Sequence, residues 1–176
     1  MPGQHLSRGY TLIEVLVALV IISVGLLGMA GLQITSLKQN QSAYMRSQAN
    51  ILAYDIIDRM RANVSAVEAG SYFITSGTNT DECETTAGCT DAAMAAHDVF
   101  RWQAQLAAEL TGGGGLVCRD ADSSDSEAGT GGAADLTRPV CGSASDSSLP
   151  VVVYVWWNDE RSSDQVSTRF ALSTSL

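Results

Sequence analysis

The sequence predicts an α+β fold, in which one long N-terminal helix packs on a small antiparallel sheet and a second, shorter helix lies beside it. Three observations lead to this prediction. An apolar run covers 23 residues, Tyr10 to Leu32, helical periodicity continues from Gln33 to Val67, and segments rich in β-branched and aromatic residues lie near the C-terminus. About 140 residues remain outside a membrane-embedded segment, which is enough for one modest domain.

The apolar run is interrupted by only three polar residues, Thr11, Glu14 and Ser23. As an α-helix it would be about 33 Å long, close to the roughly 30 Å hydrocarbon core of a bilayer. Its backbone groups would bond to one another, as a lipid environment requires. A secretory signal peptide is the alternative, but its apolar region should be shorter and should end at a small-x-small cleavage site. Ala30-Gly31 keeps that alternative open. We expect a membrane helix over residues 10–32.

Glu14 is the one acidic residue in this run. Placing a carboxylate in lipid costs on the order of 3 kcal/mol or more, so the residue predicts a cationic partner. The alternative is that Glu14, near the helix end, lies at the level of the lipid headgroups.

Three glycines, Gly25, Gly28 and Gly31, follow at three-residue intervals. Each lowers helix stability by up to about 1 kcal/mol relative to alanine. They are consistent with a close-packing face for neighbouring helices, or with local unwinding of the helix during assembly, which we favour.

The residues GYTLIE, from Gly9 to Glu14, resemble the class III signal of type IV pilins and of the pseudopilins of type II secretion. The resemblance implies a type IV pilin-like fold and a leader, residues 1–9, that prepilin peptidase removes by cutting between Gly9 and Tyr10. It also implies that Tyr10 becomes the N-methylated first residue and that Glu14 pairs with the α-amine of an adjacent subunit. This chain has Tyr10 where phenylalanine is usual, and Gly31 where major pilins commonly have a proline.

From Gln33 to Val67 the chain has no proline or glycine, and the same helix is expected to continue, with Ala69-Gly70 as its stop. Asp55 with Arg59, and Asp58 with Arg61, are spaced to pair along its exposed side. Apolar residues at spacings of three and four predict the face on which the domain packs: Met45, Ala49, Leu52, Ile56, Met60 and Val64.

A second helix is expected to begin at a cap formed by Thr90 or Asp91 and to end at the glycine run 112–115. Trp102 is interpreted as a core residue under the sheet. An aspartate followed by Trp102, Leu106 and Leu110 before a glycine run resembles PilV-type minor pilins. The apolar face of the helix is predicted to contain Ala93, Ala96, Val99, Phe100, Gln103, Leu106 and Leu110.

Five segments are candidates for strands. The strongest is Pro150 to Trp157, apolar on both faces and therefore predicted to be central and covered by the helix on one side. Val166 to Ser173 alternates and should be its half-buried antiparallel partner, joined through a turn at Asn158 to Gln165. The weaker candidates are Ser71 to Thr75, Leu116 to Arg119 and Arg138 to Cys141.

Four cysteines, Cys83, Cys89, Cys118 and Cys141, lie in the part of the chain that should be exported to an oxidising compartment. An even count predicts two disulfides, with three possible connectivities. Loop closure favours neighbours, Cys83 with Cys89 and Cys118 with Cys141. A zinc site is disfavoured because neither pair has CxxC spacing.

No residue pattern indicates catalysis, a metal site or a cofactor. His97, beside Asp98 in the second helix, is expected to be solvated rather than catalytic. The acids around Asp122 and Asp125 fail the spacing and glycine requirements of an EF-hand. The net charge of −9 argues against nucleic acid as a partner. We therefore expect a chain that is a substrate of enzymes and not itself an enzyme.

The resemblance implies a minor pilin of the type IV pilus. In that family, such subunits form a complex with other minor pilins that primes polymerisation, caps the pilus tip and supports twitching motility and adhesion. The implied partners are prepilin peptidase, other minor pilins, the major pilin, the inner-membrane assembly platform and a tip adhesin. Residues 10–32 would anchor the chain by a single pass in the bacterial inner membrane, with residues 33–176 in the periplasm. After assembly the chain would lie in the pilus at the cell surface.

Two other functions remain open. A minor pseudopilin of type II secretion would share the N-terminal motif, and only the two disulfides and the acidic Ser/Gly-rich loop favour the pilus. A membrane-anchored enzyme or ligand-binding module is the third, and the missing catalytic set argues against it.

Overall fold

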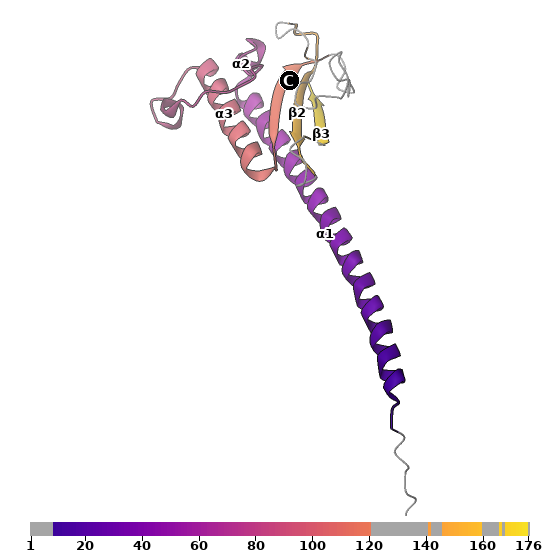
Figure 1. Cartoon of the computed structure of the whole chain (residues 1–176). Coiled ribbons are helices and arrows are strands. Elements are labelled where there is room, and N and C mark those ends of the chain that lie inside the picture. Colours follow the sequence, from indigo (N-terminus) through magenta and orange to yellow (C-terminus); the bar gives the residue numbers. More distant parts are fainter. Residues whose placement is uncertain (1–8, 121–140, 142–145, 160–165, 167, 176) are drawn as a thin grey trace, which may run out of the picture. The chain divides into compact units, whose positions relative to one another are not determined.

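The computed structural model describes residues 9–120, 141, 146–159, 166 and 168–175. It divides the chain into two compact units, Met1–Ser42 and Ala43–Leu176, which are described separately. The elements are α1 (Leu12–Ala62), α2 (Val64–Glu68), a 3₁₀ turn η1 (Asp81–Glu84), α3 (Asp91–Glu109), β1 (Gly114–Arg119), β2 (Val151–Trp157) and β3 (Thr168–Thr174) (Figure 1).

In the first unit, α1 begins at a cap formed by Thr11. The Thr11 hydroxyl and carbonyl oxygens both accept from the Glu14 amide, at 3.4 and 3.1 Å. Further along, Ser23 Oγ donates to Leu19 O at 2.6 Å and Thr35 Oγ1 to Gly31 O at 3.1 Å. These two hydroxyls are thereby satisfied within the helix, as an apolar surrounding would require. An 18-residue window of α1 has a mean hydropathy of 2.7, so by length and composition the helix can cross a membrane.

In the second unit, α1 ends earlier than the sequence predicts. The backbone of Asn63 leaves the helical region, with φ −134° and ψ 57°, and its carbonyl starts the short helix α2. The Asn63 side chain donates to Asp91 O at 2.9 Å, so its amide fastens this break to the start of α3. The prediction of one continuous helix to Val67 is therefore wrong. Val64, placed by periodicity on the buried face, is 44% exposed because the break changes the phase of the helix.

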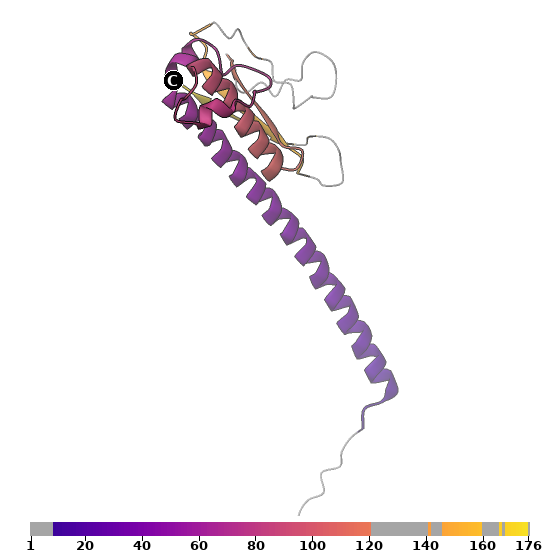
Figure 2. The ribbon, with the colours of Figure 1, turned by 90° about the vertical axis from the view of Figure 1, so that its left-hand side faces the viewer.

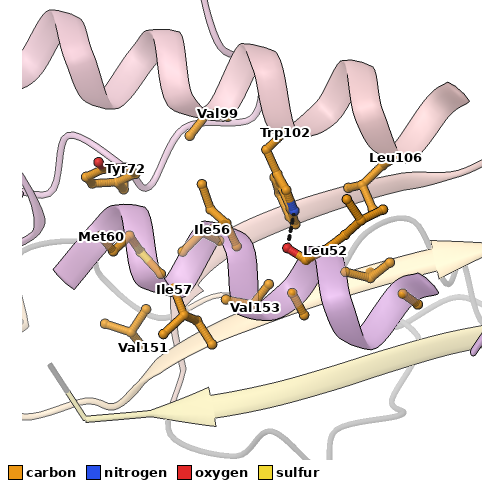
Figure 3. Close-up of a cluster of buried hydrophobic side chains, with 14 of the residues drawn as sticks. Leu52, Ile56, Ile57, Met60, Tyr72, Val99, Trp102, Leu106, Val151 and Val153 are labelled. Carbon is orange, nitrogen blue, oxygen red and sulfur yellow. Dashed lines mark hydrogen bonds between the residues drawn. The ribbon is translucent and has the colours of Figure 1, made fainter. Parts of the chain in front are cut away.

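The rest of the predicted apolar stripe of α1 is confirmed, and it forms the centre of the core. Met45, Ala49, Leu52, Ile56 and Met60 are all buried. In Figure 3, α3 contributes Val99, Trp102 and Leu106 from one side of α1, and β2 contributes Val151 and Val153 from the other. The apolar residues recur at helical spacing because the face of α1 that they form is covered by α3 and β2.

The three strands form an antiparallel sheet in the order β1-β2-β3. β2 is the central strand and β3 its antiparallel partner, as predicted, while β1 begins two residues before the predicted Leu116. Residues of one sheet face join the core with the helices, namely Val117, Val151, Val153, Val155, Trp157, Phe170 and Leu172. The opposite face carries Cys118, Val152 and Tyr154. β2 is therefore apolar on both faces because both are buried.

α3 lies on the same side of the sheet as the buried residues of α1 (Figure 2). Its N-terminal cap is as predicted. Thr90 Oγ1 accepts from the Ala93 amide at 3.2 Å. The buried face of α3, however, is centred on Ala95, Val99, Trp102 and Leu106, and Phe100 is 37% exposed. Apolar residues alone predicted a face turned toward Ala93, Ala96 and Phe100, because the pattern did not allow for buried polar residues at positions 97 and 98.

Two weaker strand predictions have different outcomes. Ser71 to Thr75 is not a strand. Gly70, at φ 76°, reverses the chain after α2, and Tyr72 then enters the core as a turn residue. The candidate Arg138 to Cys141 lies outside the described residues except for Cys141, which is in neither helix nor strand. Most of the predicted turn at Asn158 to Gln165 also lies outside them.

Candidate functional site

The N-terminal motif consists of two exposed residues outside regular structure, Gly9 and Tyr10, followed by a capped helix. Gly9 and Tyr10 precede α1 without regular structure, and both are exposed, Tyr10 at 83%. Thr11 is the cap and Glu14 is the third helical residue, which together match the capping-box spacing Thr-x-x-Glu. The helix therefore begins at Leu12, and the Gly9–Tyr10 bond lies before it, between two exposed residues outside regular structure.

Glu14 lies in the first turn of α1, where the partial positive charge of the helix end favours a carboxylate. Its side chain is exposed, and no ion pair with it is found among the described residues. The Thr11 cap occupies its backbone amide and leaves the carboxylate oxygens available. The geometry thus offers an acid, one turn into an apolar helix, for a cation from outside the chain.

In the first unit, the surface of α1 from Val15 to Leu32 is apolar on all sides except at Ser23. Every described residue from 10 to 40 is exposed, and large side chains between Val15 and Leu32 are 49–74% exposed. A soluble monomer rarely shows an apolar patch of this extent. Such a surface is stable only in lipid or against other apolar helices.

Gly25, Gly28 and Gly31 lie within α1 without local unwinding. A Cβ added at any of the three would meet no heavy atom within 4 Å. The chain's own fold therefore does not require glycine at these positions. Neither of the two interpretations, close packing or loosening on assembly, is tested within a single chain.

The second unit contains two disulfides, Cys83–Cys89 and Cys118–Cys141, with sequence separations of 6 and 23 residues. The first closes the loop around η1, and the second ties the end of β1 to residue 141. Described cysteines include no free thiol. Groups of three or more His, Cys, Asp or Glu with metal-binding geometry are also not found in the described part of the chain.

Arg59, Tyr72 and Asp98 form a polar cluster that joins α1, the turn after α2, and α3. Arg59 Nη1 donates to Asp98 Oδ1 at 3.1 Å, and the Tyr72 hydroxyl donates to Asp98 Oδ2 at 2.7 Å. Arg59 also pairs with Asp55 at 2.9 Å, as the spacing predicted, and Arg61 with Asp58 at 2.9 Å. Because both oxygens of Asp98 are bonded, the carboxylate can be buried in α3.

Burial, together with the adjacent Asp98 carboxylate, raises the pKa of Tyr72 above its ordinary value of 10.0. The unfolded chain ionises this phenol near pH 10, whereas the folded chain keeps it protonated. The stabilisation is therefore complete below about pH 10 and is lost above it at up to about 1.4 kcal/mol per pH unit.

We expect Tyr72→Phe to lower the free energy of unfolding by about 1–2 kcal/mol at pH 7, since Asp98 loses a donor. Above pH 10 this deficit should shrink, because the wild-type chain then loses the stabilisation that its protonated phenol provides, whereas the variant has no phenol at this position. Urea unfolding of the full chain in detergent micelles at pH 7, 10 and 11 measures both effects. Tyr54→Phe is the control, since Tyr54 is 53% exposed. A deficit that stays constant to pH 11 would contradict the assignment.

His97 is buried, and the prediction that it is solvated is wrong. Its side chain is only 6% exposed. Nδ1 accepts from the Thr80 amide at 3.1 Å, and Nε2 lies 3.2 Å from Glu84 Oε1, which also accepts from Arg101 Nη1 at 2.8 Å. His97 thus holds the disulfide-closed loop against α3. Sequence periodicity placed it on a polar face because it did not include this loop as a second packing partner.

The chain matches two family models. Residues 5–30 match the model described as the prokaryotic N-terminal methylation motif. Residues 31–100 match the model described as Tt1218-like, type IV pilin Tt1218. Together the two matches run without a gap over more than half of the 176 residues, through α1 and into α3. No curated protein and no solved structure matches the chain.

Proposed function

Because this chain belongs to the type IV pilin family, we propose that it is a minor pilin that primes assembly of the type IV pilus. In this proposal it acts in a complex with other minor pilins at the pilus tip and so supports twitching motility and adhesion. The observation that carries the proposal is the exposed Gly9–Tyr10 bond followed by a Thr11-capped apolar helix with Glu14 in its first turn.

The proposed processing follows from the same residues. Prepilin peptidase cuts between Gly9 and Tyr10, removes residues 1–9, and methylates the new amino group of Tyr10. Residues 10–32 hold the subunit in the inner membrane by a single pass, and residues 33–176 form the periplasmic domain. The apolar surface of α1, exposed on all sides, supports this anchoring.

Assembly in the proposal transfers α1 from lipid into a bundle of neighbouring helices. A carboxylate leaving the membrane interface for an apolar bundle needs a cation with it, and the amino group of Tyr10 on an adjacent subunit has that charge. Glu14 therefore favours addition of a subunit in one register. The partners are other minor pilins, the major pilin and the inner-membrane assembly platform, with a tip adhesin carried by the same complex.

Two features, one in each unit, support the minor role. α3 carries Trp102, buried against α1, in the Trp–Leu–Leu–glycine arrangement that resembles PilV-type minor pilins, and Gly31 stands where major pilins commonly have proline. A minor pseudopilin of type II secretion would share the N-terminal motif and is the second candidate.

Deletion of the gene distinguishes the two candidates. We expect the deletion strain to lose surface pili and twitching while secretion through a type II system continues, and complementation to restore both. In sheared pili, quantitative mass spectrometry should find this chain far below the main subunit. Normal pili together with lost secretion would identify a pseudopilin, and abundance equal to the main subunit would contradict a minor role.

A further inference from the structure

We propose that a pocket at one end of the sheet, anchored by Arg119, binds a carboxylate group. The pocket has a volume of about 250 Å³ and is lined by Arg119, Ser147, Ser148, Leu149, Pro150, Val151, Thr174 and Ser175. We call it the Arg119 pocket. It is independent of the N-terminal motif and of the proposed function.

The Arg119 pocket is formed where all three strands meet in one row. Arg119 is the last residue of β1 and pairs with Val151, the first residue of β2, which pairs in turn with Thr174, the last residue of β3. The loop before β2 adds Ser147 and Ser148. Backbone pairing therefore holds three of the lining residues, Arg119, Val151 and Thr174, in one row across the sheet.

Arg119 is a buried cation without a counter-ion in the described part of the chain. The residue is 7% exposed. None of the ion pairs found within 4 Å among the described residues includes it. Nη1 donates to the neutral carbonyl of Leu149 at 3.0 Å, and Cζ lies 5.1 Å from the centroid of the Phe73 ring. Nε is shielded from solvent and has no hydrogen-bond partner.

An unsatisfied buried donor on a charged group is costly, and a native structure rarely keeps one without a reason. The carbonyl and ring contacts position the guanidinium, but neither supplies negative charge. Because the same side chain lines an open pocket, a ligand entering there can supply the missing acceptor.

The acids nearest to the pocket are already engaged. Asp146 Oδ1 accepts from the Ser148 amide at 3.0 Å and from the Ser148 hydroxyl at 2.6 Å. These bonds hold the pKa of Asp146 below its ordinary value, with a smaller contribution from the charge of Arg119. Asp120, next to Arg119 in sequence, accepts from the Tyr154 hydroxyl. Neither acid makes an ion pair with the guanidinium.

A carboxylate fits this arrangement better than other anions. With Nη1 bonded to Leu149 O, the guanidinium keeps the edge formed by Nε and Nη2, and two parallel bonds to a carboxylate match that edge. Because Nε is shielded from solvent, binding at this edge requires the guanidinium to turn toward the pocket. Ser147, Thr174 and Ser175 add hydroxyl donors. One cation beside two acids also favours a single negative charge over a doubly charged phosphate.

The first test is a titration with sodium acetate. The ¹⁵N-labelled full chain in detergent micelles is titrated while the Arg119 Nε–H signal and the amides of Ser147 and Thr174 are followed by NMR. We expect a saturable shift of these signals, with sodium chloride at equal ionic strength giving none. Equal shifts with chloride, or a shift that never saturates, would overturn the proposal, and this comparison needs no variant.

Arg119→Lys keeps the charge but removes the planar guanidinium that can make two parallel hydrogen bonds to a carboxylate. We expect acetate to bind this variant about tenfold more weakly. Arg61→Lys is the matched control, since Arg61 is more than half exposed and pairs only with Asp58 among the described residues. Unchanged acetate binding in the Arg119 variant would count against the assignment of Arg119 as the anchor.

A second arm identifies the source of the carboxylate. A photo-reactive amino acid at position 147 is activated in intact cells. If acetate binds and position 147 crosslinks to another subunit, and if Arg119→Lys abolishes that crosslink, the carboxylate is an acidic group of a neighbouring protein. Acetate binding without a crosslink identifies a free small carboxylate. Absence of both contradicts the proposal and leaves the assembly role of α1 unaffected, so the two failures can be told apart.

Discussion

Replacing Glu14 by glutamine is expected to reduce incorporation of the chain into surface filaments by tenfold or more, while its amount in the membrane stays unchanged. Glutamine keeps the size and polarity of the side chain and removes the charge. Loss of one partner from a buried ion pair costs about 3–5 kcal/mol, and about 1.4 kcal/mol corresponds to a factor of ten. The ratio of this chain in sheared pili to that in membranes measures the effect.

Glu109→Gln is the matched control for Glu14→Gln. Glu109 is an exposed acid at the end of α3, so its neutralisation changes net charge equally without touching α1. The mass of each variant must show the same N-terminal processing as the wild-type chain, so that assembly alone is compared. Equal incorporation of Glu14→Gln and wild type would show that Glu14 does not act through its charge.

Replacing Trp102 by alanine is expected to have the largest effect on the stability of the second unit. Trp102 is fully buried between α3 and α1, and its Nε1 donates to Leu52 O at 2.9 Å (Figure 3). Truncation leaves a cavity against α1 and beneath Gly115, and should lower the free energy of unfolding by about 3–5 kcal/mol. Urea unfolding of the full chain in micelles, followed by circular dichroism, measures the loss.

Two variants separate packing from hydrogen bonding at Trp102. Trp102→Phe keeps most of the apolar volume and removes the donor, so we expect a smaller loss of about 1–2 kcal/mol. Phe100→Ala, on the more exposed side of α3, is the control and should cost less than Trp102→Phe. If Phe100→Ala and Trp102→Ala were equally destabilising, the assigned buried face of α3 would be wrong.

Periodicity was sufficient to predict elements whose neighbours are all apolar. The stripe from Met45 to Met60 and the doubly apolar strand Val151–Trp157 each pack on hydrophobic partners, so hydrophobicity alone encodes their orientation. The Thr90 cap of α3 was predictable for a different reason, because a local side chain to backbone bond determines where that helix starts.

Buried polar residues could not be placed in the same way. His97 and Asp98 are buried because Thr80, Glu84, Arg59 and Tyr72 reach them from distant parts of the chain. A local pattern contains no information about such partners. The break at Asn63 was missed for the same reason, since its bond to Asp91 O connects residues 28 positions apart.

At the candidate site the sequence was more informative. The motif from Gly9 to Glu14 is contiguous, so it is visible in the sequence, whereas the Thr11 cap was not predicted and comes from the structure. The Arg119 pocket gave no such signal. Arg119 ends an otherwise apolar strand, and only the pairing of three strands brings it beside Thr174 and the loop before β2.

Intact and peptide-level mass spectrometry of the mature protein, purified from the membrane without reduction, tests the central claim most directly. We predict a chain that begins at Tyr10 with one methyl group on its amino nitrogen, and disulfide-linked peptides joining Cys83 to Cys89 and Cys118 to Cys141. A chain that keeps residues 1–9, or one that begins after Ala30, would contradict the account, because neither could present the amino group that Glu14 is proposed to bind.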